Sequence, residues 1–177
     1  MDHLWSPWRL PYILRGGEDT GCVFCRALAG AAPSTHSENA PDDLVVFRGH
    51  TCFVILNLYP YNNGHLLIVP NRHISSLAPA TGEELHELIE LTRRAELALN
   101  EAYTPQGINM GINLGKPAGA GVLDHVHMHA VPRWNGDTNF MTVLGETRVL
   151  PEELPQTARK LRPIFERLAA TDGPATR

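Results

Sequence analysis

Short apolar runs separated by turn-forming residues dominate the first half of the chain. Leu44 to Phe47 and Cys52 to Asn57 are rich in β-branched and aromatic residues, and Arg48-Gly49-His50-Thr51 between them has the composition of a hairpin turn. A third run of this kind, His65 to Val69, ends at Pro70. The pattern predicts three strands before any long helix.

The longest helical signal begins at Thr81. Glu84 stands three residues later, and this pair has the spacing of a capping box. Apolar positions then recur at the i, i+3, i+4 and i+7 spacing of one helical face. The members of this predicted face are Leu85, Leu88, Ile89, Thr92, Ala95 and Leu99. Pro105 bounds the helix, because proline cannot continue it.

Two more strands and a second helix are expected in the remaining half. Ile108 to Leu114 and His125 to Val131 flank a glycine-rich loop, and Glu152 to Ala169 has a helical pattern with Pro163 as a potential kink. Hairpin-length strands with one inserted helix indicate an α+β fold. We therefore expect a mainly antiparallel sheet of about five strands, one long inserted helix and a C-terminal helix.

The chain is expected to form one compact domain with two flanking segments. Its 177 residues suit a single core. Residues 1–20 are rich in Trp, Pro and Gly and lack a clear period, so they are expected to form an arm on the body or on a partner subunit. Residues 21–145 would form the domain, and residues 146–177 a C-terminal helix and tail.

Composition and charge exclude several classes of protein. The hydrophobic share of 43% and the charged share of 19% are ordinary for a globular domain, which argues against disorder and against a membrane protein. A net charge of −4 provides no global basic field for extended nucleic acid, although a local site for a small anion remains open. The first residues lack the features of a secretory signal, so a cytoplasmic location is expected.

Three histidines in strict alternation are the strongest chemical signal. In a strand, the alternation of His125, His127 and His129 with apolar residues sends all three imidazoles to one face, roughly 6.5 to 7 Å apart. Neighbouring imidazoles could then contact one polyphosphate or one metal ion. A solvated strand face and a catalytic metal site are the alternatives. Metal-dependent hydrolases of the His-x-His-x-Asp-His kind require a carboxylate and a histidine next, whereas this chain continues with Ala130-Val131-Pro132.

The glycine-rich loop before these histidines favours phosphate as the ligand. Gly115, Gly119 and Gly121 permit close approach of backbone N–H groups to anionic oxygens. A plain turn between two strands is the alternative interpretation, because the loop contains no Walker-type lysine motif.

The run His125-Val126-His127-Met128-His129-Ala130-Val131 resembles the His-φ-His-φ-His-φ-φ signature of the histidine triad (HIT) superfamily. The resemblance extends from about Cys22 to Met141 and includes Gly64 to Pro70. Trp5 to Arg9 and Pro132 to Met141 are similar, more narrowly, to the bacterial branch related to diadenosine tetraphosphate (Ap4A) phosphorylases. The resemblance to the histidine triad superfamily implies a HIT-like fold for residues 21–145.

The resemblance also implies roles for individual residues. His127 would attack the α-phosphorus and become nucleotidylated, His129 would hold the scissile phosphate oxygens and assist the leaving group, and His65 would lie beside the nucleophile. Imidazole suits this role because it is neutral and nucleophilic near pH 7. The implied substrate-binding residues are Asn57 for the ribose hydroxyls, and Asn113 with the backbone of Gly119, Gly121 and Val122 for the α-phosphate.

Cys22-x-x-Cys25 by itself is compatible with zinc binding, thiol redox chemistry or chance. Some HIT proteins bind a structural zinc through such a pair and two histidines, which here implies the ligands Cys22, Cys25, His73 and His125. Two thiolates and two neutral imidazoles form the closed shell of a structural site. Cys52 is expected in the core, and no organic cofactor is expected.

The function implied by the resemblance is cleavage of dinucleoside polyphosphates at the α-phosphate, with phosphorolysis slightly preferred to hydrolysis. Hydrolysis of nucleoside phosphoramidates or nucleotidyl adducts is the nearest alternative. A nucleotide-binding or zinc-stabilised interaction protein without turnover is the alternative from another class. HIT proteins are commonly dimers, so a homodimer is expected.

Overall fold

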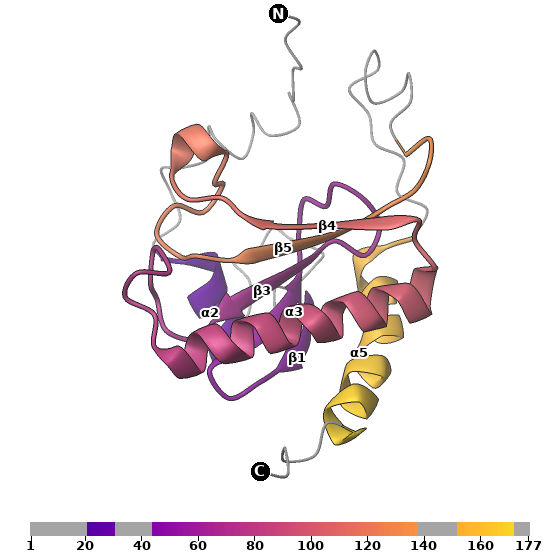
Figure 1. Cartoon of the computed structure of the whole chain (residues 1–177), viewed down its shortest axis with the longest axis horizontal. Coiled ribbons are helices and arrows are strands. Elements are labelled where there is room, and N and C mark those ends of the chain that lie inside the picture. Colours follow the sequence, from indigo (N-terminus) through magenta and orange to yellow (C-terminus); the bar gives the residue numbers. More distant parts are fainter. Residues whose placement is uncertain (1–20, 31–43, 138–151, 172–177) are drawn as a thin grey trace, which may run out of the picture.

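A computed structural model describes residues 21–30, 44–137 and 152–171, so the predicted arm at 1–20 lies outside the described residues. Five strands form one sheet in the order β1-β2-β3-β5-β4, and every pairing is antiparallel (Figure 1). The strands are β1 (Val45–Arg48), β2 (Cys52–Leu56), β3 (Leu66–Pro70), β4 (Gly107–Ile112) and β5 (Met128–Arg133). The predicted α+β fold with an antiparallel five-stranded sheet is confirmed.

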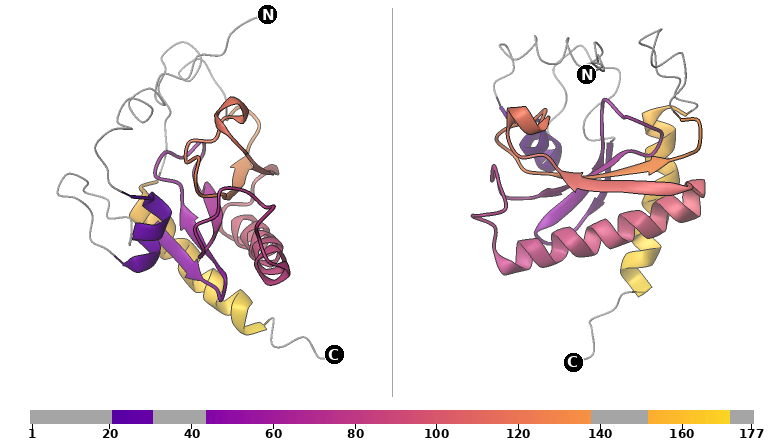
Figure 2. Two further views of the ribbon diagram at one scale, coloured as in Figure 1. Left: turned by 90° about the vertical axis from the view of Figure 1, so that its left-hand side faces the viewer. Right: turned by 45° about the horizontal axis from the view of Figure 1, so that its top comes forward.

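Within the part of the chain that the structure describes, three α-helices pack against this sheet, and a short 3₁₀ turn (Lys116–Ala118) lies between β4 and β5. The helices are α2 (Val23–Ala29), α3 (Gly82–Tyr103) and α5 (Leu154–Thr171). Helix α3 contacts β2, β3 and β5, whereas α5 contacts β1 and α3. Figure 2 shows α2 and α3 on opposite sides of the sheet.

The C-terminal helix shares the core of the sheet. Ala158, Leu161 and Phe165 of α5 are fully buried and belong to the same apolar cluster as β2 and β3, all of whose residues are buried. Phe165 stacks on Phe47 of β1 with ring centroids 5.9 Å apart. Pro163 lies inside α5, and the helix continues through it. Burial of apolar surface therefore holds α5 to the sheet.

Helix α3 begins as predicted, but its buried face is rotated. The hydroxyl of Thr81 accepts a hydrogen bond from the N–H of Glu84, whose carboxylate accepts one from the N–H of Thr81, which completes the capping box. The predicted face was wrong at Leu85 and Ile89, which are 37% and 59% exposed. The buried stripe extends instead to Leu91 and Ala98, on the flank opposite these two residues. Its members are Glu84, Leu88, Leu91, Thr92, Ala95, Ala98 and Leu99.

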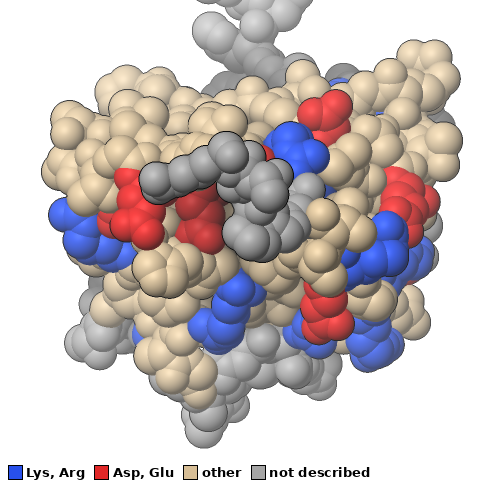
Figure 3. Space-filling model, turned by 60° about the horizontal axis from the view of Figure 1, so that its bottom comes forward, with Lys and Arg blue, Asp and Glu red and all other residues tan. Residues whose placement is uncertain are grey.

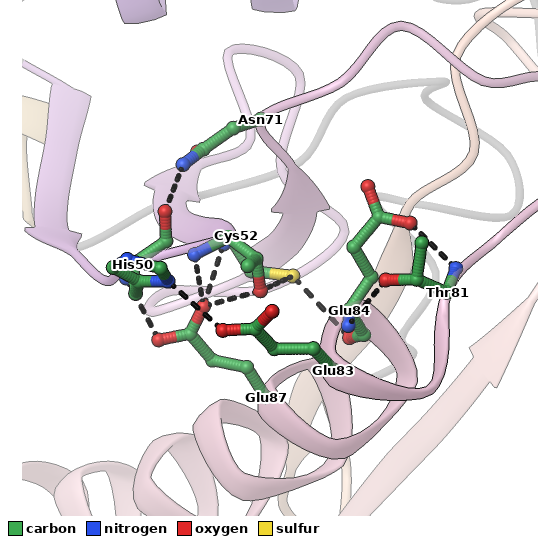
Figure 4. Close-up of polar contacts among 8 residues, drawn as sticks. His50, Cys52, Asn71, Thr81, Glu83, Glu84 and Glu87 are labelled. Atoms are coloured by element: carbon green, nitrogen blue, oxygen red, sulfur yellow. Dashed lines mark hydrogen bonds and ion pairs between the residues drawn. The ribbon is translucent and has the colours of Figure 1, made fainter.

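Glu87 of α3 holds the turn between β1 and β2 (Figure 4). Its carboxylate accepts hydrogen bonds from the N–H groups of His50 (2.8 Å), Thr51 and Cys52 (2.8 Å), and from the hydroxyl of Thr51 (2.6 Å). The side chain of Asn71 donates to the carbonyl of His50 (2.9 Å). Backbone groups that a tight turn leaves unpaired are thus satisfied by α3 and by the segment after β3.

The strand that carries the triad begins later than predicted. It was expected to begin at His125, yet β5 runs from Met128 to Arg133, and β4 ends at Ile112 rather than Leu114. The N–H of Val126 donates to the carbonyl of Ile74 (2.7 Å), so this segment pairs with the chain that follows β3 before it enters the sheet.

Charges of both signs are interspersed on the face of the molecule drawn in Figure 3. Among the described residues, no helix combines the length and apolar character needed to cross a membrane.

Candidate active site and metal cluster

The predicted catalytic histidines come together at the junction of β3 and β5. His65 directly precedes β3 and is fully buried, and its Nε2 lies 3.0 Å from Nδ1 of His129 in β5. The rings of His127 and His129 have centroids 4.9 Å apart. The ring of Tyr61 stacks on that of His129 at 6.2 Å. The loop before β3, the segment before β5 and β5 itself thus contribute to one imidazole cluster.

Hydrogen bonds fix the tautomers of His65 and His129. The backbone N–H of Tyr61 donates to Nδ1 of His65 (3.1 Å), so this nitrogen carries the lone pair. Neutral His65 then carries its proton on Nε2 and donates it to Nδ1 of His129. His129 consequently carries its own proton on Nε2, and this N–H is the donor it can offer to a substrate oxygen.

His127 has the opposite assignment of its two nitrogens. Its Nδ1 lies 2.9 Å from the carbonyl oxygen of His125, which only accepts, so Nδ1 carries the proton and Nε2 is the basic nitrogen. Burial lowers the pKa of His127, and this effect outweighs the hydrogen bond to the carbonyl, which raises it. A neutral imidazole with a basic Nε2 has the form required of a nucleophile.

The predicted metal ligands Cys22, Cys25, His73 and His125 form a second group, here called the Cys2His2 cluster. Their ligand atoms all lie within 4.8 Å of one another. Nδ1 of His125 is 3.2 Å from Sγ of Cys22 and 3.7 Å from Sγ of Cys25, whose sulfur is 3.3 Å from Nδ1 of His73. The edges of a tetrahedral zinc site with such ligands measure roughly 3.3 to 3.8 Å. Three of the donor–donor distances are thus close to these edges, and the four residues could hold a metal ion.

The surroundings of the Cys2His2 cluster favour metal binding. Nε2 of His125 lies 2.9 Å from the carbonyl oxygen of Pro70 and donates to it, which leaves Nδ1 unprotonated toward the two sulfurs. Burial opposes ionisation of the Cys22 thiol, but hydrogen bonds from the backbone N–H groups of Cys25 and Phe24 favour the thiolate and lower the pKa of this group. A thiolate and a correctly oriented imidazole are the forms that bind metal.

Phe24 joins the two groups of histidines. Its ring centroid lies 5.4 Å from that of His125 and 5.0 Å from that of His127. His125 forms a second connection, because its side chain belongs to the Cys2His2 cluster while its backbone carbonyl accepts a hydrogen bond from His127 of the imidazole cluster. Sequence reasoning missed Phe24, and its position between the two cysteines was the available signal. It also missed Tyr61, which donates its backbone N–H to His65 and stacks its ring on His129.

The predicted substrate-binding residues lie in two places. Asn57 follows β2, and its Nδ2 is 3.3 Å from Nδ1 of His65 while its Oδ1 accepts from the N–H of Tyr59 (3.0 Å). The others follow β4, in the connection that leads to His125, and they are Asn113, Gly119, Gly121 and Val122. The N–H of Gly119 donates to the carbonyl of Lys116 (3.0 Å), and Val122 packs against the core.

The antiparallel sheet and its alternating histidines define the class of protein. The chain belongs to the histidine triad family, because the HIT domain model matches residues 38–136. Among its relatives, an AP-4-A phosphorylase of Mycobacterium tuberculosis is 39% identical over 163 residues, which cover 91% of this chain and 83% of that protein. The bis(5'-adenosyl)-triphosphatase of Dictyostelium discoideum is 31% identical over 128 residues, which cover 69% of this chain and 85% of that protein.

Solved structures share the fold. A zinc-bound histidine triad family protein from Mycobacterium smegmatis superimposes with a TM-score of 0.65 at 26% identity, covering 85% of this chain and 97% of that one. The family resemblance predicted from the sequence is thereby confirmed.

Proposed function

We propose that the protein cleaves dinucleoside polyphosphates such as Ap4A at the α-phosphate, through a nucleotidyl group on His127, with inorganic phosphate as the preferred acceptor. The observation that carries this proposal is the arrangement of nitrogens, with Nε2 of His127 basic and Nε2 of His129 protonated. The 39% identity to an AP-4-A phosphorylase supports the substrate class and the acceptor.

The reaction proceeds in two displacements at one phosphorus. Nε2 of His127 attacks the α-phosphorus, a P–N bond forms, and the P–O bond to the leaving nucleotide breaks while His129 donates its Nε2 proton to the departing oxygen. The carbonyl of His125 stabilises the positive charge that develops on the attacking ring. Phosphate then attacks the same phosphorus, the P–N bond breaks, and ADP leaves.

The residues around the imidazole cluster would hold the substrate. Asn57 would bind the ribose hydroxyls, and Asn113 with the backbone of Gly119, Gly121 and Val122 would bind the α-phosphate. The chemistry requires no organic cofactor, because a histidine carries the nucleotidyl group.

Incubation with Ap4A, with and without inorganic phosphate, tests the substrate and the acceptor. Separation of the products by anion-exchange chromatography should give ADP plus ATP when phosphate is present. AMP plus ATP at an equal rate in both conditions would show that water is the acceptor, the second candidate that the 31% identity to a triphosphatase favours. Lack of any product would contradict the proposal and leave adduct hydrolysis or binding without turnover.

The His127→Asn variant tests the nucleophile. It should abolish turnover yet retain nucleotide binding measured by isothermal titration calorimetry, because it removes only the attacking nitrogen. In the wild type, an alkaline quench followed by intact-mass measurement should reveal a nucleotidyl adduct. A variant with near-normal turnover would exclude His127 as the nucleophile.

The Cys2His2 cluster would hold a structural zinc ion in this proposal. The four ligands form a closed shell, so the metal would contribute stability rather than chemistry. Bound there, it would connect α2 to the segment that enters β5. The zinc-bound histidine triad protein from Mycobacterium smegmatis supports this part of the proposal.

The quaternary structure and location complete the proposal. Among the described residues, β4 forms one edge of the sheet, and Met110 of this strand is 40% exposed. Leu85 and Ile89 of α3 are also exposed. We infer that a second copy of the chain covers these apolar side chains in a cytoplasmic homodimer. The division into an arm (1–20), a HIT domain (21–145) and a C-terminal helix and tail (146–177) is part of the same proposal.

A further inference from the structure

The two ends of the loop from Asn57 to His65 are hydrogen-bonded to each other. The N–H of Asn57 donates to the carbonyl of His65 (2.9 Å), and the N–H of His65 donates to the carbonyl of Asn62 (3.2 Å). Together with the hydrogen bond from the N–H of Tyr61 to Nδ1 of His65, these contacts make the orientation of the imidazole depend on the position of the whole loop. What holds the loop therefore also positions His65.

One anchor of the loop lies at the end of β5. The side-chain amide of Asn62 donates to the carbonyl of Pro132 (3.0 Å) and to a carboxylate oxygen of Asp137 (2.7 Å). Asp137 is itself paired with Arg133 at 2.6 Å. This anchor belongs to the strand that carries His129.

A second anchor comes from outside the residues that match the HIT domain model, which end at 136. The side-chain amide of Asn63 donates to Oε2 of Glu152 (3.2 Å), just before α5. The same oxygen accepts hydrogen bonds from the hydroxyls of Tyr103 (2.6 Å) and Thr157 (2.9 Å), while Oε1 pairs with Lys160 at 2.5 Å. One largely buried carboxylate thus connects the loop, the end of α3 and the start of α5.

Tyr103 also supports the loop by direct contact. Gly64, the residue before His65, has a φ of +77°, and a Cβ built there would lie 3.1 Å from both the Tyr103 ring and the Leu99 side chain. The loop backbone therefore rests against the end of α3 at the residue before His65. Because the hydroxyl of Tyr103 is held by Glu152, the position of this ring depends on the same carboxylate.

We propose that Glu152 is a positioning residue for the active site, which holds His65 and Asn57 in place through Asn63 and Tyr103. The segment that follows the HIT domain would then support catalysis as well as the core. This inference rests on the function proposed above. A carboxylate suits the role because a single oxygen must accept from three donors, and charge strengthens each of these hydrogen bonds.

Exchanging the amide at position 63 with the carboxylate at position 152 tests the hydrogen bond between Asn63 and Glu152. Asn63→Asp places a second carboxylate beside Glu152, and we expect kcat/KM for Ap4A to fall about tenfold, because small misplacement of catalytic groups is costly. Glu152→Gln should lower kcat/KM about threefold, because it removes the charge and replaces one acceptor oxygen by an NH2 donor while the shape of the side chain remains. The double variant pairs the new carboxylate with the new amide and should recover to within about twofold of Glu152→Gln alone.

Thr157→Val is the matched control. It removes another hydrogen bond to the same carboxylate oxygen but does not touch the loop. Its melting temperature should fall while kcat/KM, measured well below melting, stays within about twofold of the wild type. Equal losses of activity in Thr157→Val and Asn63→Asp, or no recovery in the double variant, would overturn the inference.

Imidazole ¹⁵N spectra separate failure of this inference from failure of the proposed function. The Nδ1 signal of His65 should have the shift of an unprotonated nitrogen in the wild type, should change in Asn63→Asp, and should return in the double variant. If the wild type does not cleave Ap4A, the proposed function fails while these spectra still test the positioning. Unchanged spectra in Asn63→Asp would refute the positioning role.

Discussion

His65 determines which nitrogen of His129 carries the proton, although the proposed chemistry takes place at His127 and His129. The N–H of Tyr61 fixes the lone pair of His65, and His65 in turn donates to Nδ1 of His129. Without that donor, His129 is free to carry its proton on Nδ1 and to present a lone pair where the departing oxygen needs a donor.

Replacement of His65 by leucine tests this dependence. The substitution keeps a side chain of similar size in a fully buried position and removes the hydrogen bond to His129. We expect kcat for Ap4A to fall about 100-fold with a smaller change in KM, because general acid catalysis contributes on that order. His86→Asn is the control, since His86 is exposed on α3. A kcat within a few-fold of the wild type would show that His129 needs no partner.

The sequence indicated the participants of this cluster but not the direction of their hydrogen bonds. The alternation of His125, His127 and His129 and the position of His65 after Gly64 were sufficient to select the four histidines. The tautomers depend on two backbone groups, the N–H of Tyr61 and the carbonyl of His125, and backbone groups leave no mark in the sequence.

At the level of elements, the carboxylate of Glu87 in α3 accepts hydrogen bonds from backbone N–H groups of the β1–β2 turn. Burial opposes ionisation of its carboxylate, but the hydrogen bonds from Thr51, His50 and Cys52 lower the pKa of Glu87 below its ordinary value. The folded protein therefore favours the charged form more than the unfolded chain does, and stability from this contact is present above the unfolded pKa. It is lost as the pH falls through the folded pKa.

The Glu87→Gln variant should be less stable than the wild type by about 2 kcal/mol at pH 7, because an ionised acceptor is replaced by a neutral one. Urea unfolding followed by circular dichroism measures the difference. The gap between the two proteins should begin to shrink as the pH falls below the ordinary pKa of glutamate, about 4.3, where the unfolded chain takes up a proton, and it should close as the pH falls through the lower pKa of the folded protein. Glu83→Gln is the control, since its contact with His50 is exposed and such pairs contribute under about 1 kcal/mol.

The sequence predicted which segments are helices and which are strands, but it predicted less well where each begins and ends and which side chains of a helix are buried. The capping box at Thr81 and Glu84 is a local signal, and α3 begins there. The rotation of its buried face depends on which residues the sheet presents to it, and this is a tertiary effect that helical spacing cannot show. The late start of β5 has the same origin, because Val126 pairs with Ile74 across the fold.

For the whole molecule, the proposed zinc would connect segments about 100 residues apart. Helix α2 has seven residues, too few for a stable isolated helix, so its position depends on tertiary contacts. Phe24 and the Cys2His2 cluster provide such contacts on the side of the sheet opposite α3.

Elemental analysis should find about one zinc per chain, and chelation should lower the melting temperature. Cys22→Ala should lose the metal and melt lower. Cys52→Ala is the control for removal of a thiol, because Cys52 is buried and burial raises its pKa to about 12. It should retain the zinc. A wild type that is metal-free and melts at the same temperature with and without a chelator would contradict the prediction.

Because β4 lies at the edge of the sheet, amide hydrogen exchange in this strand can detect whether two copies of the chain associate through it. Within the described residues, β4 pairs only with β5, and successive N–H groups of an edge strand alternate between the paired side and the open side. In an isolated chain, slow and fast exchange should therefore alternate from Gly107 to Ile112. If two copies join edge to edge, the fast set should slow as the protein concentration rises, and the alternation should disappear without any substitution in the protein.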